Sequence, residues 1–233
     1  MWKKMKTGNT TLVTLILMWI VPQVAWAAPY TIDKSKSIFG MITHKGGYAA
    51  ALAHNHLIFA RDYEATLTFD PVNINDSRLT LSMPVSGLVN DEPAVSAAWS
   101  PRISALEILS EPLPTVSASD RSRIFKDMMS PDQLDPEHFP MINLVVSNLE
   151  KKESTVAHEP FGYQITVALT VHGQTVEKVV PANIKVDGDT LQAESVGKFA
   201  FTEFGFAPYS AFWGAVKNQD EIHAYVNLTA KAL

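Results

Sequence analysis

The sequence contains no cysteine, which excludes disulfide frameworks, thiolate zinc sites and cysteine nucleophiles. It also has no excess of basic residues, because 19 Lys and Arg stand against 24 Asp and Glu and the formal net charge is −5. This balance argues against a nucleic-acid-binding protein, whose affinity depends on Lys and Arg contacts with phosphates. Charged residues make up only 18% of the 233 residues and hydrophobic residues 46%, so the chain can bury a large core and is not disordered.

The N-terminus has the pattern of an export signal. Three lysines within residues 3–6 precede an apolar stretch over 12–21, and residues 25–27 (AWA) have the small-x-small pattern of a signal-peptidase site. The apolar stretch is shorter than the ~20 residues that a transmembrane helix needs. The sequence therefore predicts a cleaved signal peptide over 1–27 and a mature domain over 28–233, with a retained N-terminal anchor as the alternative.

The predicted export and the missing cysteines together indicate a compartment. An exported protein without disulfides must be stabilised by its core alone, which is common in the bacterial periplasm and unusual among extracellular animal proteins. We therefore expect a periplasmic protein, and removal of the lysine-containing signal would make it more acidic.

Alternation of apolar and polar residues dominates the rest of the chain. In 221–229 the apolar positions Ile222, Ala224, Val226 and Leu228 fall on one face of a strand, which puts His223 on the polar face. Further segments with strand character are 64–70, 78–85, 141–149, 164–169 and 175–186. A period of two with one polar face is typical of antiparallel sheet. Seven or eight such strands predict an all-β barrel or sandwich.

Segment 92–138 interrupts this alternation. Prolines divide its first half, where a short helical turn is predicted around 104–109. A longer helix is predicted from Ser119 to Met129, because Ser117 followed by Asp120 resembles an N-terminal capping pair and two later prolines stop the helix. No stretch is long enough to be a linker, so one domain is predicted.

Five segments resemble motifs of the YceI family of exported, polyisoprenoid-binding bacterial proteins, in the same order along the chain. They are 30–37 (YTIDKSKS), 67–70 (LTFD), 135–142 (DPEHFPMI), 169–173 (LTVHG) and 204–210 (FGFAPYS). The resemblance implies a lipocalin-like closed antiparallel β-barrel of about eight strands with a helix across it. It also implies a long isoprenoid chain in the barrel interior and no enzymatic activity. The chain departs from the family pattern at Lys36, where the family has His, and at Glu203, where many members have Arg.

A histidine pair, His54 and His56, stands where the general family pattern has a single His. At positions i and i+2 of a strand, both imidazoles would project from one face. Such a pair could bind a transition metal, with His44, Asp62 or Glu64 as a third ligand. Hydrogen bonding to the polar end of a ligand and a purely structural role are the open alternatives.

A dense group of aromatic residues near the C-terminus is the second candidate site. Its members are Phe199, Phe201, Phe204, Phe206, Tyr209, Phe212 and Trp213. These rings could fill a core without any ligand. They could equally form the wall or rim of a ligand cavity, because flat rings give contact area at little cost in conformational entropy.

The leading hypothesis is a non-enzymatic periplasmic protein that encloses an isoprenoid or other lipid-like molecule in its barrel. On this hypothesis the protein needs no cofactor, binds no nucleic acid and makes transient contact with a membrane. The sequence does not determine its oligomeric state. One alternative is a metal- or haem-handling module built on His54 and His56. The other is a packed barrel that acts as a stress-related interaction protein. A continuous apolar lumen would favour the carrier, and an interior filled by its own side chains would favour the packed barrel.

Overall fold

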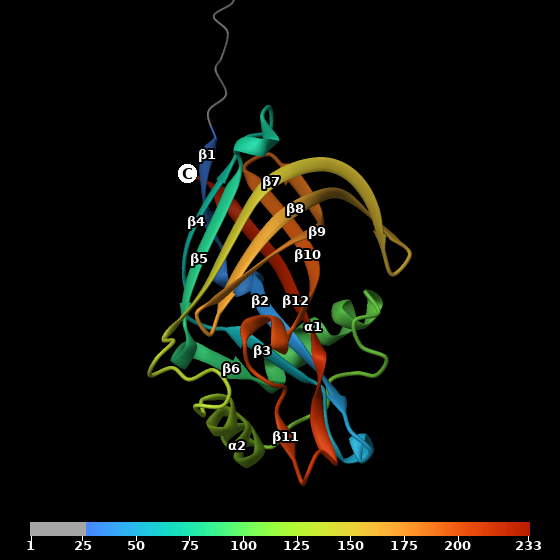
Figure 1. The fold of residues 1–233 in the computed structure, drawn as a ribbon. Helices are drawn as coiled ribbons and strands as arrows, with labels where there is room; N and C mark the ends of the chain where they lie inside the picture. The colour runs from blue at the N-terminus through green and yellow to red at the C-terminus, as the bar shows by residue number, and fades with distance from the viewer. Residues whose placement is uncertain (1–26) are drawn as a thin grey trace, which may run out of the picture.

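The computed structural model describes residues 27–233, so the export signal predicted over 1–27 lies, except for Ala27, outside the described residues. Eight antiparallel strands form a closed barrel, in which β1 pairs with both β4 and β12 (Figure 1). In the order of hydrogen-bonded neighbours they are β1 (Ala28–Ile32), β4 (Glu64–Phe69), β5 (Arg78–Pro84), β7 (Met141–Val156), β8 (Glu159–Val171), β9 (Gln174–Asp187), β10 (Thr190–Ala200) and β12 (Val216–Ala232). Closure confirms the predicted barrel and excludes the sandwich.

Below the barrel in Figure 1, strand β12 extends into a smaller antiparallel sheet. Its 17 residues pair with β10 along the barrel and also with β2 (Ile38–Gly46). The sheet then continues through β3 (His56–Ala60) to β6 (Leu88–Asn90), and the two-residue β11 (Ser210–Ala211) pairs with the start of β12. One long strand therefore joins both parts of the molecule.

Two α-helices lie beside this sheet, α1 (Pro93–Ala105) and α2 (Ala118–Met128). Helix α2 confirms the predicted helix within one residue, and the Ser117 hydroxyl accepts the predicted hydrogen bond from the backbone N–H of Asp120. Helix α1 begins much earlier than the predicted turn around 104–109. Pro93 suits a first helical position because its fixed φ is already helical, and helix α1 passes through Pro101. Short 3₁₀ turns cover Lys34–Lys36, Ala50–Leu52, Ile74–Asp76, Val85–Gly87 and, as η5, Phe201–Phe204.

The barrel wall separates two hydrophobic cores. The inner core lines the lumen and continues under the smaller sheet, and the outer core lies between the wall and helix α1. The outer core contains Ile103 of α1 with Phe161, Val196 and Tyr225 of the wall, all buried. Strand residues that point out of the barrel in this region are therefore covered by protein.

This covering corrects one expectation from the alternation pattern. His223 is only 7% exposed, whereas the pattern placed it on the solvent face. It pairs in register with Ile42, a member of the outer core, so the polar face of β12 is buried at this point. The Nδ1 atom of His223 lies 2.7 Å from Nε2 of His44, and the two rings form one hydrogen-bonded pair.

The His44–His223 pair is expected to make the stability of the protein depend on pH. Burial, helped by the neighbouring His44, lowers the pKa of His223 to about 4, and burial also lowers the pKa of His44. The nearby charges have opposite effects, because Glu221 raises and Lys198 lowers the pKa of His223. The unfolded chain, with a His pKa near 6.5, takes up protons before the folded one does.

The free energy of unfolding should therefore fall as the pH drops from about 6.5 to about 4. The expected loss through His223 is about 2 to 3 kcal/mol. Chemical denaturation at pH 7.5 and 4.5, for the wild type and a His223→Gln variant, measures it. The variant should lose much less stability over this window, and equal losses would contradict the assignment.

Candidate ligand-binding site

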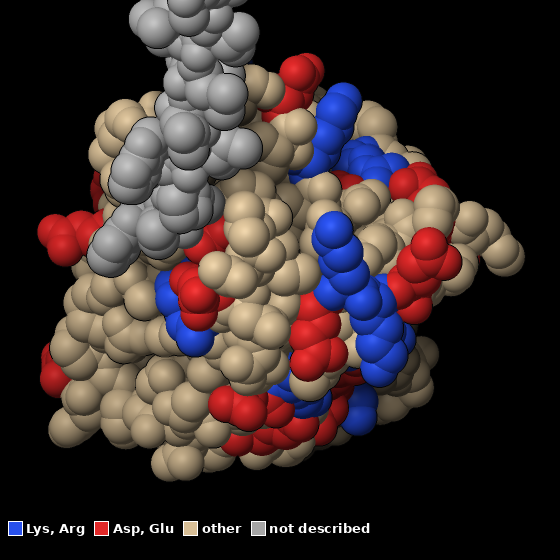
Figure 2. Space-filling view, turned by 90° about the horizontal axis from the view of Figure 1, so that it is seen from above, with Lys and Arg blue, Asp and Glu red and all other residues tan. Residues whose placement is uncertain are grey.

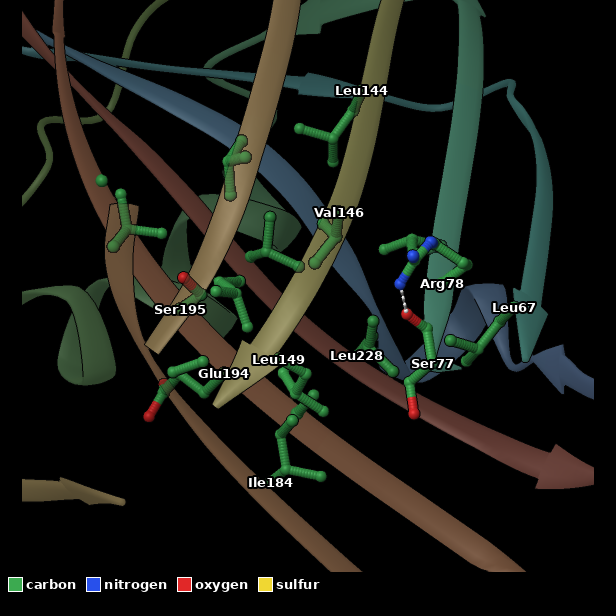
Figure 3. A pocket seen from close by; sticks show the side chains of 18 of the residues that line it. Leu67, Ser77, Arg78, Leu144, Val146, Leu149, Ile184, Glu194, Ser195 and Leu228 are labelled. Carbon is green, nitrogen blue, oxygen red and sulfur yellow. Dashed lines mark hydrogen bonds between the residues drawn. The ribbon is translucent and has the colours of Figure 1, made fainter. Parts of the chain in front are cut away.

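The barrel lumen holds an apolar cavity of about 100 Å³, which we call the barrel cavity. Figure 3 shows aliphatic side chains from opposite walls pointing into it, among them Leu144, Val146, Leu149 and Leu228. Its further apolar lining includes Leu67, Phe69, Leu79, Ile165, Val167, Val180, Ala182, Ile184, Leu191, Ala193, Phe199, Ala224 and Val226. The lumen is thus partly filled by its own side chains and partly open.

Two of the described residues in the wall of this cavity are charged, and both are already hydrogen-bonded to other protein groups. The exposed Arg78 donates hydrogen bonds from Nη1 to the carbonyl oxygens of Asn75 and Ser77, at 2.6 and 2.8 Å. Glu194 lies on the outward side of β10, and its carboxylate points away from the apolar side chains in Figure 3. The lumen therefore offers apolar contact and little electrostatic attraction.

Glu194 is held outside the lumen by a network that includes helix α1. Arg102 of α1 donates to both carboxylate oxygens of Glu194, at 2.9 and 2.6 Å, and makes two 2.7 Å bonds to Glu159 of β8. The Tyr225 hydroxyl and the Asn227 amide also donate to Glu194, at 2.9 and 3.1 Å. Burial raises the pKa of Glu194, but these donors outweigh it and hold the pKa below its usual value. The network fixes α1 on the barrel wall and keeps Glu194 ionised.

On the face seen in Figure 2, basic and acidic side chains are interspersed rather than gathered into a patch of one sign. This view looks down on the end of the barrel at which β1 begins. The described residues that are visible in this view therefore build no strong field of one sign.

A second cavity, also of about 100 Å³, lies between the smaller sheet and helix α2, and we call it the sheet cavity. Its lining is more polar than that of the barrel cavity. The sheet contributes Met41, Thr43, His56, Ile58 and Asn218, and the facing segments contribute Ile124, Asp127, Met128, Gln133, Leu134, Phe201, Phe206 and Tyr209.

Within the sheet cavity, His56 is positioned by a buried carboxylate. Its Nδ1 lies 2.8 Å from Oδ2 of Asp91, whose side chain is 2% exposed. The other oxygen of Asp91 accepts the backbone N–H of Leu57 at 3.0 Å, so the carboxylate is itself fixed. Thr43 stands opposite His56 in the β2–β3 register and is also buried.

The aromatic group divides between these features. Phe199 lines the barrel cavity, and Phe201 and Phe206 line the sheet cavity. Phe204 is buried and stacks on Phe199 with ring centroids 6.0 Å apart. These four rings, which we call the aromatic partition, belong to one continuous core, and they contribute to the linings of both cavities. Tyr209 lies at the sheet cavity.

The other two aromatic candidates lie on the surface. Phe212 is 73% exposed and Trp213 is fully exposed, and both have left-handed φ values, 52° and 54°, in the turn before β12. Neither lines the barrel cavity or the sheet cavity.

The histidine pair is not brought to one face. His54 is exposed and lies two residues before the start of β3, whereas His56 is the first residue of the strand and faces the sheet cavity. Of the suggested third ligands, His44 is paired with His223. Within residues 27–233, no group of three or more His, Cys, Asp or Glu side chains could hold a metal ion.

Sequence reasoning missed Thr43 and Asp91. Thr43 shares its face of β2 with Met41, so alternation within 38–46 would have placed it with the buried side chains. Asp91 carries no local signal, because its position beside His56 depends on the pairing of β3 with β6.

The sequence profile of the YceI-like domain matches residues 30–230. This chain belongs to the YceI family. Among solved structures, BcnA of Burkholderia cenocepacia is 15% identical, with a TM-score of 0.58 over 86% of this chain and 100% of that one. A mutant YceI protein of Campylobacter jejuni with a monobromobimane guest is 16% identical, with a TM-score of 0.50 over 76% of this chain and 84% of that one.

At these identities the structural likenesses establish the shared YceI fold. No curated protein sequence is significantly similar to this YceI chain. Neither helix within residues 27–233 is long and apolar enough to cross a membrane.

Proposed function

We propose that this YceI domain is a non-enzymatic periplasmic binding protein that encloses a long apolar molecule, an isoprenoid or a related lipid, in its barrel. The observation that carries the proposal is the lumen: a closed wall surrounds an apolar cavity, and the two charged residues of its described lining are already hydrogen-bonded to other protein groups. Such a cavity favours a ligand by removing its methylene groups from water, at roughly 0.8 kcal/mol for each.

The size of the cavity sets a condition on the ligand. About 100 Å³ is less than the roughly 300 to 1,000 Å³ of typical small-molecule pockets, so the barrel cavity alone holds a short segment of chain. A longer chain requires the aromatic partition to move aside and join the two cavities. This predicts selectivity for chain length and slow entry of the ligand.

Calorimetric titration with prenyl alcohols of 10, 15 and 20 carbons tests the proposal. We expect saturable 1:1 binding whose affinity rises with chain length, and native mass spectrometry should show the same complexes. Native mass spectrometry of protein purified under mild conditions should also show a bound apolar molecule. Unliganded protein that takes up none of the three alcohols would contradict the proposal.

We further propose that exchange of the ligand takes place at a lipid surface. Four large apolar side chains are exposed on two neighbouring loops, Tyr48, Leu52, Phe212 and Trp213. The backbone N–H of Ala49 donates to the carbonyl of Ala215 at 2.9 Å and holds the loops together. Exposed apolar groups of this kind mark interaction sites, and Trp and Tyr rings favour membrane–water interfaces.

Replacing Trp213 by Ser should therefore reduce binding to phosphatidylcholine vesicles and slow the transfer of a labelled prenyl alcohol from them about tenfold. The free energy of unfolding should change by less than about 0.5 kcal/mol, because the side chain is fully exposed. Val179→Ser, at a 64% exposed site on the barrel wall, is the matched control and should leave transfer unchanged. Equal transfer rates for Trp213→Ser and the wild type would exclude this surface.

A further inference from the structure

The hydroxyl of Thr43 is a buried polar group without a partner. Thr43 is 2% exposed, and its Oγ1 makes no hydrogen bond within the described part of the chain. Its side chain shares the face of β2 that lines the sheet cavity, because Thr43 and Met41 pair with His56 and Ile58 of the same lining. Buried hydroxyls are nearly always hydrogen-bonded, so an unpaired one beside a cavity suggests a ligand atom.

His56 supplies the complementary group. In the neutral imidazole one nitrogen is a donor and the other an acceptor. The carboxylate of Asp91 at 2.8 Å fixes the proton on Nδ1, which leaves Nε2 as an acceptor. Because Thr43 and His56 are directly opposite each other, their Cβ atoms are about 5 Å apart. One ligand oxygen can therefore reach both side chains.

The charges around the sheet cavity define the chemical class of that oxygen. Among the described residues that line it, Asp127 is the only one with a full formal charge, and none is Lys or Arg. A diphosphate or carboxylate would lack a cationic partner and would be repelled by Asp127. A neutral hydroxyl fits, because it can donate to Nε2 of His56 and accept from Oγ1 of Thr43.

We infer that the sheet cavity binds the hydroxyl end of an apolar ligand, with Thr43 and His56 as its hydrogen-bonding partners. This inference rests on the proposed function and deepens it, because it orients the ligand. The polar end lies under α2, and the apolar chain passes the aromatic partition into the barrel cavity. The protein is then selective for prenyl alcohols over prenyl diphosphates and over hydrocarbons of the same length.

The test titrates three probes, geranylgeraniol, the hydrocarbon with the same carbon skeleton and geranylgeranyl diphosphate, into the wild type, Thr43→Val and Thr43→Ser. We expect the wild type to bind the alcohol about tenfold more tightly than either other probe. Thr43→Val should lose about fivefold to tenfold in affinity for the alcohol and none for the hydrocarbon, whereas Thr43→Ser should keep the preference. The unliganded Thr43→Val protein should melt no lower than the wild type, because the lost hydroxyl had no partner.

The outcomes separate this inference from the proposed function. If the wild type binds alcohol and hydrocarbon equally and Thr43→Val changes neither affinity, the polar subsite is wrong while the barrel carrier stands. Tighter binding of the diphosphate, or a lower melting temperature for unliganded Thr43→Val, would also overturn the subsite. If none of the three probes binds to the wild type, the proposed function fails and the subsite fails with it.

Discussion

Replacing Arg102 by Met is expected to lower the free energy of unfolding by about 2 to 4 kcal/mol. The guanidinium makes four hydrogen bonds, two to Glu159 and two to Glu194, and the Glu194 side chain is only 11% exposed. Without Arg102, a largely buried carboxylate keeps the Tyr225 and Asn227 donors but loses its countercharge. Removing one partner of a fully buried pair costs about 3 to 5 kcal/mol, and the expected value is lower because Arg102 is 32% exposed. Guanidinium denaturation curves measure the difference.

Glu159→Gln is the matched control for this prediction. It removes a carboxylate from the same network, but the Glu159 side chain is 40% exposed. We therefore expect the free energy of unfolding to fall by less than about 1 kcal/mol. If the loss in Arg102→Met comes from the isolated charge of Glu194, adding Glu194→Gln should restore part of the stability. If the free energy of unfolding of Arg102→Met lies within about 0.5 kcal/mol of the wild-type value, the network does not hold α1 on the barrel.

The acid side of the stability curve gives a second test of the same network. In the wild type the pKa of Glu194 is held below its usual value, so its contribution to stability is present at neutral pH and is lost as the pH falls through the folded pKa. In Arg102→Met the carboxyl is protonated at higher pH, which relieves the isolated charge. The difference in the free energy of unfolding between the wild type and Arg102→Met should therefore be largest near pH 7 and become smaller below about pH 4.

The sequence predicts several of the strands in which one face is solvated. Alternation identified parts of β4, β5, β8 and β12, and local capping located α2. The pattern fails where protein covers the polar face. His223 occupies a position that alternation assigns to solvent, yet it is buried beside the outer core. Only the folded chain shows this, because α1 and the wall are far apart in sequence.

The sequence predicts the candidate site only in part. The density of aromatic residues in segment 199–213 predicts a ligand wall or a core cluster, and the structure places the segment around both cavities and on the surface. Its rings are separated because η5 and the left-handed turns at Gly205 and Phe212 redirect the chain several times within fifteen residues. Apolar composition alone could not tell a filled lumen from an open one, since the same side chains line both.

Replacing Ala224 by Leu is expected to weaken binding of a long prenyl alcohol about thirtyfold. Ala224 lines the barrel cavity from β12 and is only partly buried, so the added carbon atoms enter open space in the lumen. Three added carbons displace about three carbons of ligand, which costs roughly 2 kcal/mol of binding free energy at about 0.8 kcal/mol for each. Calorimetric titration with geranylgeraniol measures the loss.

Stability should move in the opposite direction to binding, which distinguishes a filled cavity from a damaged fold. The new side chain makes apolar contacts inside the barrel, so the free energy of unfolding should be unchanged or higher, unlike in a core that is already packed. Ala98→Leu, on the exposed surface of α1, adds the same atoms outside the lumen and should leave affinity unchanged. If Ala224→Leu retains full affinity for the alcohol, the ligand does not occupy the barrel cavity. If it loses affinity together with stability, the lumen is too tightly packed at this point to admit a chain.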